Sequence, residues 1–258
     1  MKSPFFSIIT CTHNSKKFLA KNIHSVDLQT FTDFEHIFID GFSTDGTVDV
    51  ISKYKRNNTK NIRMFRSKAK GISNAMNVGV RKAKGKYILH LHSDDYFYDS
   101  GVLNDVHDFL IRNPKVDWIY GMINVVEENG VSVGTFPSRK IYRFLPQDFL
   151  KYFNFIPHQA VFINKSVFLK YGFYDEAISS AMDLDMWLRL KNKTTWKFID
   201  RTISCYTIRK GAQSSGFIRK NENDKNMITV EKRYLNSLEF RVFQLVNMIV
   251  DRYNKTRR

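Results

Sequence analysis

The sequence predicts an α/β fold with a mostly parallel central sheet flanked by helices. Short runs rich in β-branched and aromatic residues alternate with helix-like stretches over about the first 95 residues. A loop of small and polar residues follows each run, and the last of these loops contains adjacent carboxylates at Asp94 and Asp95. Alternating strands and helices imply right-handed crossovers between parallel strands. Open sheets of this kind bind their ligands at the carboxyl ends of the strands.

The expected elements follow one another in chain order. Strands are expected at 5–10, 34–39 and 62–65, with a fourth that ends at 94, and helices up to about 26, at about 48–54 and at about 72–83. In the loop after the second strand, Asp45 can cap the next helix and Gly46 can adopt a positive φ. The loops at 10–14, 40–46 and 93–95 are therefore expected along one edge of the sheet.

Bulk composition favours one large domain with an appendage. A chain of 258 residues with 43% hydrophobic content can bury a full core. The two cysteines, Cys11 and Cys205, lie far apart in the sequence, which fits a reducing compartment without a disulfide framework. The first four residues run directly into a strand, so we expect no signal peptide. No uncharged run reaches the roughly 18 residues that a membrane span requires.

Adjacent carboxylates at the end of a buried strand suggest a metal site. One or two acidic side chains plus substrate phosphates hold hard divalent ions such as Mg2+ or Mn2+ in nucleotide-using enzymes. Because Ser-Asp-Asp is also ordinary turn chemistry, Asp94 and Asp95 can equally form a turn or a helix cap. His90 and His92 point to one strand face, since residues i and i+2 share a face, and could form a zinc site with the carboxylates or simply pack.

Five segments occur in a fixed order, at 7–14, 39–47, 71–79, 93–95 and 183–189. In order and spacing they resemble the family-2 glycosyltransferases of the GT-A fold, in the branch that builds bacterial surface polysaccharides. The resemblance covers roughly residues 5–215. It implies a GT-A domain at 1–216, with a nucleotide-binding half at about 1–96 and an acceptor half at about 97–216, followed by a basic amphipathic helical extension at 217–258.

The resemblance implies a nucleotide pocket lined by these loops. Its residues would be Cys11, His13, Asn14, Asp40 and Asp94. A carboxylate at Asp40 can accept the N3–H of uracil, which favours UDP as the donor carrier, whereas a loop cap is the alternative. His13 stands where many relatives carry a tyrosine that can stack on the base, although an isolated histidine is more often a surface residue. Gly41 stands where relatives often carry a second aspartate.

At the acidic stretch, the resemblance implies that Asp94 touches the ribose and diphosphate and that Asp95 holds the metal, with Mn2+ or Mg2+ as the cofactor. Many relatives carry another aspartate where this chain has His92. A diphosphate leaving group requires a hard, partly hydrated ion, which favours these ions over zinc.

Asp183 is the implied catalytic base. Transfer of a sugar with inversion requires a base within hydrogen-bond reach of the acceptor hydroxyl, while the metal stabilises charge on the departing diphosphate. Asp183 and Asp185 are two residues apart on the expected helix, so they do not face each other and one base is expected. The alternative is that Asp183 only interacts with the helix dipole.

The remaining pocket residues come from several segments. The donor and acceptor pocket would include Gly71, Asn74, Asn77, His158, Gln159, Arg209 and Ser214. His158 either shapes the acceptor pocket, contacts phosphate or packs in the core. The basic, hydroxyl-rich loop 209–216 is either a lid that orders over a diphosphate or a solvated charged loop.

The net charge of +16 is concentrated in part near the end of the chain. Residues 231–258 contribute +4, because seven Lys and Arg outweigh three acids. Leu238, Val242, Leu245 and Ile249 recur there at helical spacing. Such a helix can lie on an anionic membrane surface, pack on the catalytic domain or join two subunits in a homo-oligomer.

The resemblance implies an inverting, metal-dependent enzyme of the hexosyl- or N-acetylhexosaminyltransferase class. It would move a single sugar from a nucleotide donor to a glycan or lipid-linked acceptor in polysaccharide or lipopolysaccharide synthesis. Its location would be the cytoplasm, with peripheral contact at the inner face of the cytoplasmic membrane.

Three other classes of protein are alternatives to this interpretation. A nucleic-acid partner is not expected, since no RRM, KH or helix-turn-helix signature accompanies the basic charge. A nucleotidyltransferase of related fold would carry a glycine-rich basic loop after the first strand, which is absent. A degenerate nucleotide-sugar-binding subunit remains open because of Met76 and His92.

Overall fold

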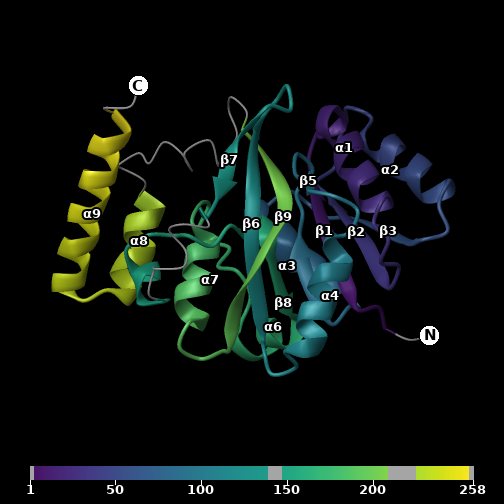
Figure 1. Ribbon diagram of the computed structural model, residues 1–258. Coiled ribbons are helices and arrows are strands. Elements are labelled where there is room, and N and C mark those ends of the chain that lie inside the picture. The colour runs from purple at the N-terminus through teal and green to yellow at the C-terminus, as the bar shows by residue number, and fades with distance from the viewer. Residues whose placement is uncertain (1–2, 139–146, 209–224, 256–258) are drawn as a thin grey trace.

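The computed structural model describes residues 3–138, 147–208 and 225–255 of the chain (Figure 1). The strands are β1 (Phe6–Thr12), β2 (Phe34–Asp40), β3 (Asn61–Arg66), β4 (Tyr87–His90), β5 (Tyr96–Phe97), β6 (Trp118–Glu127), β7 (Ser132–Phe136), β8 (Val161–Asn164) and β9 (Trp196–Ile208). The helices are α1 (Lys16–Asp27), α2 (Thr47–Arg56), α3 (Ile72–Lys82), α4 (Val102–Arg112), α6 (Lys165–Tyr171), α7 (Met182–Leu190), α8 (Lys225–Tyr234) and α9 (Ser237–Lys255), with short 3₁₀ turns η1 (Gln147–Lys151) and η2 (His158–Ala160).

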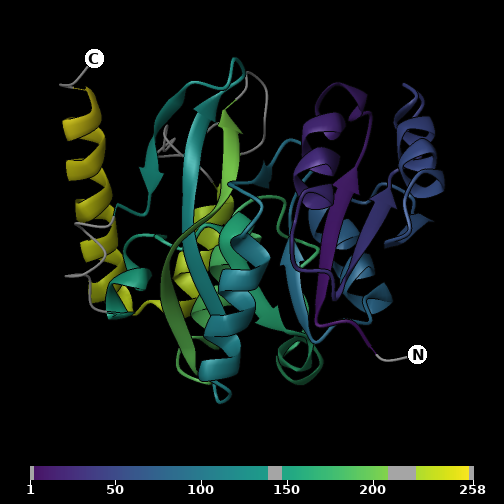
Figure 2. The same cartoon turned by 45° about the vertical axis from the view of Figure 1, so that its right-hand side comes forward.

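In the described part of the chain these strands form one sheet in the order β3-β2-β1-β4-β8-β6-β9-β5, with β7 also paired to β6. The pairs β3-β2, β2-β1 and β1-β4 are parallel, as the sequence predicts for the first half. The second half is mixed, because β8 runs antiparallel to both β4 and β6 while β9 is parallel to β6. Helices cover both faces of the sheet (Figure 2), so the predicted α/β fold is confirmed.

Three strands of the first half, β1, β2 and β4, are buried on both faces. Ile9 packs with Met76 of α3 on one face, whereas Phe38 packs with Leu19 of α1 on the other. The helix α3 approaches closely at Gly79, where a Cβ would lie only 2.4 Å from the Ile9 Cγ2 atom. Strands buried on both faces read as continuous hydrophobic runs, which is why this half was predictable.

The fourth strand is shorter than expected, because β4 ends at His90 and not at Asp94. The buried Asn22 side chain of α1 explains the early end. Its amide nitrogen donates to the carbonyl oxygens of His92 (2.9 Å) and Asp95 (3.0 Å). These bonds take the place of strand pairing, so the adjacent carboxylates lie in a turn beyond the sheet.

Three stacked tryptophans hold α7 on the second half of the sheet. The Trp118 ring of β6 lies 5.1 Å from the Trp187 ring of α7 and 5.0 Å from the Trp196 ring of β9, measured between centroids. Stacked aromatic pairs contribute about 0.5–1.5 kcal/mol each beyond the area that they bury. The first turn of α7 carries Asp183, so this stack fixes the position of that residue relative to the sheet.

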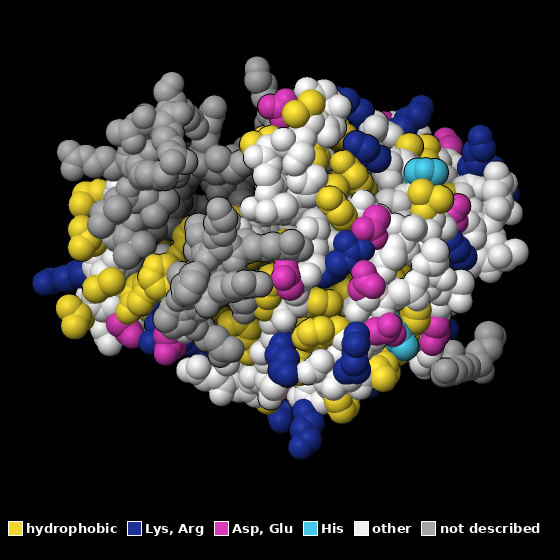
Figure 3. Space-filling model, viewed as in Figure 1, with side chains coloured by type: hydrophobic (Ala, Val, Ile, Leu, Met, Phe, Trp, Pro, Cys, Tyr) yellow, Lys and Arg dark blue, Asp and Glu magenta, His cyan; other side chains and the backbone are white. Residues whose placement is uncertain are grey.

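The two C-terminal helices differ in how they meet the domain. Val230 of α8 is fully buried in the main core, next to Met227 and Tyr234. On α9, by contrast, Leu238 and Leu245 are 72% and 52% exposed. Hydrophobic side chains are visible on this side of the molecule (Figure 3), at the end opposite α2 and β3. The expected domain boundary at 216–217 falls outside the described residues.

Candidate active site

The loops after β1 and β2 meet at one edge of the sheet, as expected. The register pairs Thr12 with Asp40, and the Gly41 N–H donates to the Thr12 carbonyl oxygen at 2.8 Å. Asn14 joins the two loops more firmly: its N–H donates to Ser43 Oγ at 2.9 Å, and its side-chain oxygen accepts from the Thr44 N–H at 2.9 Å. The role of Asn14 in the described structure is therefore to connect the loops.

Asp40 is fully buried and already engaged by protein groups. Its carboxylate accepts from Thr12 Oγ1 at 3.0 Å, from Ser43 Oγ at 2.6 Å and from the Ser43 N–H at 3.0 Å. The Arg66 guanidinium lies 3.7 Å away. A carboxylate offers about four acceptor positions, so these contacts leave little capacity for a base. The alternative of a loop cap therefore describes the geometry of Asp40. Its contact with the nucleotide base stays a prediction.

The other first-loop residues lie on opposite sides of the chain. His13 is exposed, with its Nδ1 atom 3.0 Å from the Gly41 carbonyl oxygen. Cys11 instead packs in the hydrophobic core with Ile9, and burial raises the pKa of its thiol to about 12. The expectation that the Cys11 side chain lines the nucleotide pocket is not supported by this position. Ile9 and Cys11 share a strand face, so the alternation of residues along the strand already indicated that the Cys11 side chain is buried.

Phe42 is a residue of this edge that the sequence reasoning missed. Its side chain is 51% exposed, its φ is 64°, and the Arg66 guanidinium carbon lies 4.6 Å from its ring centroid. A bulky residue at positive φ is an outlier, and such strain tends to persist at functional sites. The available signal was an aromatic residue inside a loop of small and polar residues.

The acidic turn presents its two carboxylates unequally. Asp95 is only 2% exposed and its N–H donates to the His92 carbonyl oxygen at 3.0 Å, whereas Asp94 is partly exposed. Within the described ranges, no group of three or more His, Cys, Asp and Glu side chains could hold a metal ion on its own. Two adjacent carboxylates fit a hard ion that completes its shell with phosphate oxygens and water.

Asp183 lies in the first turn of α7 and faces His158. Its Oδ2 atom is 3.6 Å from His158 Nδ1, while its Oδ1 atom accepts from the Leu184 N–H at 2.9 Å. Both side chains are 14% exposed. Burial alone would raise the pKa of Asp183, yet the His158 ring and the backbone N–H groups hold that pKa below its usual value. The carboxylate is therefore ionised near neutral pH.

Two more histidines, His92 and His90, continue from His158 in a row behind this pair. The ring centroids of His158 and His92 are 5.1 Å apart, and those of His92 and His90 are 6.5 Å apart. Burial lowers the pKa of His92 to about 3 and that of His90 well below its usual value. Both rings are neutral as a result. Because β4 ends at His90, His92 lies beyond the strand, and the two rings are near each other without sharing a strand face as expected.

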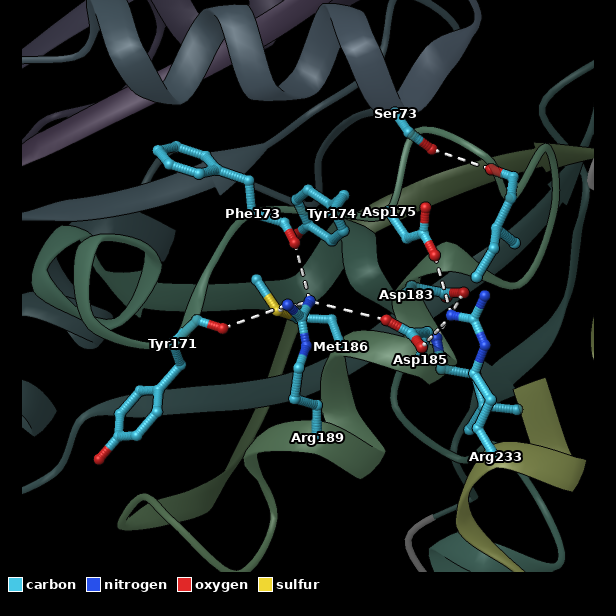
Figure 4. Close-up of polar contacts among 12 residues, drawn as sticks. Ser73, Tyr171, Phe173, Tyr174, Asp175, Asp183, Asp185, Met186, Arg189 and Arg233 are labelled. Atoms are coloured by element: carbon cyan, nitrogen blue, oxygen red, sulfur yellow. Dashed lines mark hydrogen bonds and ion pairs between the residues drawn. The ribbon is translucent and has the colours of Figure 1, made fainter.

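Asp185 belongs to a separate ionic network, shown in Figure 4. Its carboxylate accepts from Arg233 at 3.1 Å and from the Tyr234 hydroxyl at 3.0 Å, both on α8, with Arg189 at 3.6 Å. Arg233 also donates to Asp175 at 2.8 Å. Asp183 and Asp185 therefore face different partners, as their spacing predicted, and Asp185 serves to dock α8.

The α3 residues assigned to the pocket bind another protein segment instead. Asn77 is buried and donates to the Tyr174 carbonyl oxygen at 2.9 Å, and Asn74 donates to the Glu176 carboxylate at 2.7 Å. These amides attach the segment before α7 to α3, and their expected place in a substrate pocket stays a prediction. The N-cap of α3 is Gly71, with a φ of 90°, and a Cβ at this position would meet no described atom within 4 Å.

Two further expectations concern Gln159 and the loop that follows β9. Gln159 is buried, and its carbonyl oxygen accepts from Ser204 Oγ at 2.9 Å, which joins η2 to β9. Arg209 and Ser214, the expected lid residues, lie outside the described residues.

A parallel first half, a mixed second half and an acidic turn between them define the GT-A fold of the glycosyltransferases. The chain belongs to glycosyl transferase family 2, whose family model matches residues 7–172. The family expected from the sequence is thereby confirmed.

Two relatives share part of the sequence. A PGL/p-HBAD biosynthesis glycosyltransferase of Mycobacterium bovis is 31% identical over 189 residues, which cover 73% of this chain and 70% of the relative. The UDP-Glc:alpha-D-GlcNAc-diphosphoundecaprenol beta-1,3-glucosyltransferase WfaP of Escherichia coli is 33% identical over 132 residues, about half of each chain (51% and 51%).

Two solved structures share the fold. Staphylococcus aureus TarS 1–349 with UDP-GlcNAc has a TM-score of 0.67 at 21% identity, covering 82% of this chain and 60% of that one. The mannosyltransferase PcManGT of Pyrobaculum calidifontis, solved with GDP-Man and Mn2+, has a TM-score of 0.69 at 13% identity, covering 97% and 70%. The chain thus spans less than two thirds of TarS 1–349. The TarS structure contains UDP-GlcNAc, and the PcManGT structure contains GDP-Man and Mn2+.

Proposed function

We propose that this protein transfers a single sugar, with inversion, from a nucleotide-diphosphate donor to a hydroxyl of a glycan or lipid-linked acceptor. The observation that carries the proposal is Asp183, a mostly buried carboxylate kept ionised at the start of α7. Within the described ranges its ion-pair partner is a histidine and not a Lys or Arg. An ionised carboxylate is in the protonation state that a general base requires.

In this reaction Asp183 accepts the proton of the acceptor hydroxyl. The acceptor oxygen forms a bond to the anomeric carbon, and the bond from that carbon to the diphosphate oxygen breaks with its electron pair leaving on the nucleoside diphosphate. A divalent ion, when bound, offsets charge on the departing diphosphate. The acidic turn at Asp94 and Asp95 is the place where this ion would bind.

We assign the metal-facing role to Asp94, with Asp95 as its buried support. The sequence-based expectation gave the metal to Asp95. Asp94 is partly exposed, whereas Asp95 is 2% exposed. Burial and the charge of Asp95 both raise the pKa of the Cys205 thiol of β9, so Asp95 lies near that thiol. A ligand must be open to an ion and a diphosphate from solvent, which favours Asp94.

For the donor we favour a UDP-sugar of the hexose or N-acetylhexosamine class. WfaP uses UDP-Glc and TarS binds UDP-GlcNAc, while PcManGT binds GDP-Man. The base would lie against the exposed His13 and Phe42 rings at the edge that Asp40 organises. Aromatic faces stack on bases with little selectivity, so donor choice also depends on polar contacts.

For location we propose peripheral contact with an anionic membrane through α9, in polysaccharide or lipopolysaccharide synthesis. Its exposed leucines and neighbouring positive charge support contact with lipid, and WfaP acts on a diphosphoundecaprenol-linked acceptor. Among the described residues, no helix is long and apolar enough to span a bilayer. Assembly of two copies through α9 is the alternative arrangement.

The proposal is tested with purified protein and UDP-, GDP- and dTDP-sugars, each with Mn2+ or with EDTA. We expect one class of donor to bind and to be consumed only with the metal, and Asp183→Asn to keep donor binding while turnover falls about 10²–10⁴-fold. Donor binding without any transfer to glycan or polyprenol-linked acceptors would instead favour a nucleotide-sugar-binding subunit. Unchanged turnover in EDTA would exclude the metal.

A further inference from the structure

The contact between His158 and Asp183 joins two elements that are distant in sequence. His158 begins η2, just before β8, and Asp183 lies in α7. The backbone of α7 holds only Oδ1 of Asp183, through the Leu184 N–H. The His158 ring is the group at the other carboxylate oxygen, Oδ2, at 3.6 Å. In the part of the chain that the structure describes, no Lys or Arg forms an ion pair with Oδ2 in place of this ring.

The other side of His158 does not have the partners of a structural histidine. Buried side-chain nitrogens are normally hydrogen-bonded. In the described part of the chain, His158 Nε2 and both ring nitrogens of His92 and His90 are buried with no hydrogen-bond partner. The polar contact that His158 does make is with Asp183.

The groups around the pair make Asp183 the anion that His158 meets. On the β4 side, His158 faces the neutral rings of His92 and His90. Tyr174 packs on His90 with its ring centroid 5.6 Å away, and burial raises its pKa, so it is neutral too. The charge of Arg189 lowers the pKa of Tyr174 somewhat. Its guanidinium donates to the backbone carbonyl oxygens of Tyr171 and Phe173. Asp185, two residues further on α7, is held by Arg233 and Tyr234.

We propose, on the basis of the proposed transferase function, that His158 is a positioning residue that holds Oδ2 of Asp183, so that the carboxylate meets the acceptor hydroxyl in a fixed orientation. Asp183 takes the proton from the acceptor, and His158 takes none. The ring also offsets the effect of burial on the carboxylate, which keeps it ionised. His158 is thus expected to control the rate of proton transfer and its pH dependence, and to have little effect on donor binding.

The kinetic test compares His158→Asn with the unchanged protein from pH 8 down to the lowest pH at which both stay folded, because the pKa of Asp183 lies below its usual value in the unchanged protein. Asparagine keeps a side-chain donor but has a shorter reach than the imidazole, so it no longer meets Oδ2 of Asp183. We expect kcat to fall roughly 10–100-fold through lost orientation, with the KM for the donor little changed. The acid limb of kcat should also move to higher pH, because burial of Asp183 is no longer offset. The matched control is His107→Asn, a partly exposed histidine 3.2 Å from Asp108 on α4, which should leave kcat and its pH profile unchanged.

Three kinetic results would overturn the proposal. An unchanged kcat and acid limb would show that His158 only packs. A loss as large as that of Asp183→Asn would make His158 the base itself. A rise in the donor KM without a change in kcat would move His158 to the donor site. If His158→Asn does not fold, His158→Gln provides the same comparison with a longer side chain.

A second measurement needs no activity. Unfolding of the unchanged protein, His158→Asn, Asp183→Asn and the double variant by urea at pH 7 gives the coupling between the two side chains. We expect a measurable favourable coupling, larger than that of His107 with Asp108. Zero coupling would overturn the positioning role of His158 even if sugar transfer were established. Coupling without any transfer would instead contradict only the proposed function.

Discussion

Arg233 of α8 donates to the Asp185 carboxylate of α7 at 3.1 Å, across the contact between the C-terminal helices and the helix that carries Asp183. Asp185 is almost fully buried, and the same arginine reaches Asp175 at 2.8 Å. The docking of α8 therefore depends on charge as well as on the buried Val230. The expected basic extension is continuous, through α8, with the core of the domain.

Arg233→Met should destabilise the protein by removing a partner from a buried carboxylate. Hydrogen bonds to charged groups contribute about 1.5–3 kcal/mol. Arg233 is itself 41% exposed and Tyr234 and Arg189 remain near Asp185, so we expect a loss of about 1–2 kcal/mol after allowing for solvent screening. Urea unfolding measures this loss. Lys17→Met, which breaks an exposed pair with Glu128, is the control and should change stability by less than about 0.5 kcal/mol. Equal effects of the two variants would mean that α8 docks by apolar contacts alone.

Stability should fall as the pH decreases from 6.5 towards 4. Burial lowers the pKa of His36 to about 3 and that of His90 well below 6.5, so both stay neutral in the folded protein. In the unfolded chain they titrate near about 6.5, so below that pH the unfolded state binds more protons and is favoured. Each such histidine contributes a slope of about 1.4 kcal/mol per pH unit in this range.

Urea unfolding at several pH values from 7 to 4.5 tests this slope. His36→Asn should make it shallower by about one proton, whatever its effect on stability at pH 7. The exposed His24 supplies the control, since His24→Asn should leave the slope nearly unchanged. Parallel curves for the unchanged protein and His36→Asn would show that His36 is not neutral in the fold.

The strands and helices of the first half were predictable because their hydrophobic patterns are strong and local. The position of Cys11 was also available from its alternation with Ile9 on a strand buried on both faces. The contacts of the Asp40 carboxylate could not be predicted from the sequence. Its partners Thr12, Ser43 and Arg66 come from three different segments that meet only in the folded sheet. A motif gives the identity of a side chain and leaves its acceptor capacity to the tertiary structure.

Contacts between distant segments were beyond the reach of the sequence for the same reason. Asn74 and Asn77 bind the segment at 174–176, which lies about 100 residues further along the chain. The assignment of Asp183 as the base, in contrast, comes from the resemblance at 183–189 and stays a prediction, while Asp185 was correctly expected to face elsewhere. The contact of Asp183 with His158 depends on η2 and α7 meeting in the folded domain, which no local pattern encodes.

The exposed face of α9 should bind anionic vesicles weakly and in a salt-dependent manner. Each Lys or Arg near an anionic surface contributes about 1 kcal/mol, and salt screens that attraction. Leu238→Ser combined with Leu245→Ser should reduce co-sedimentation with vesicles containing phosphatidylglycerol, since both leucines are exposed on α9. Leu169→Ser is the matched control, because Leu169 is 68% exposed on α6, another helix. If the double variant keeps its vesicle binding and changes the oligomeric state, α9 joins two copies of the chain instead.

Substitution of the two adjacent carboxylates should separate metal binding from structural support. Asp94→Asn removes charge from the partly exposed carboxylate, so metal-dependent binding of the donor nucleotide should weaken at least about 10-fold with little change in stability. Asp95→Asn alters a buried group behind the turn, so stability should fall by about 1–3 kcal/mol and the metal affinity should change less. Titration of nucleotide binding with Mn2+ and urea unfolding provide the two measurements.

Asp108→Asn, on the exposed side of α4, is the control for both measurements and should alter neither. In the opposite pattern, Asp95→Asn abolishes metal-dependent binding without loss of stability and Asp94→Asn leaves that binding intact. This result would make Asp95 the metal ligand, as the resemblance implies. The ion would then have to enter the turn from the side of β9, where the charge of Asp95 reaches Cys205. That route is distinguishable, because Cys205→Ser should then alter the metal affinity as well.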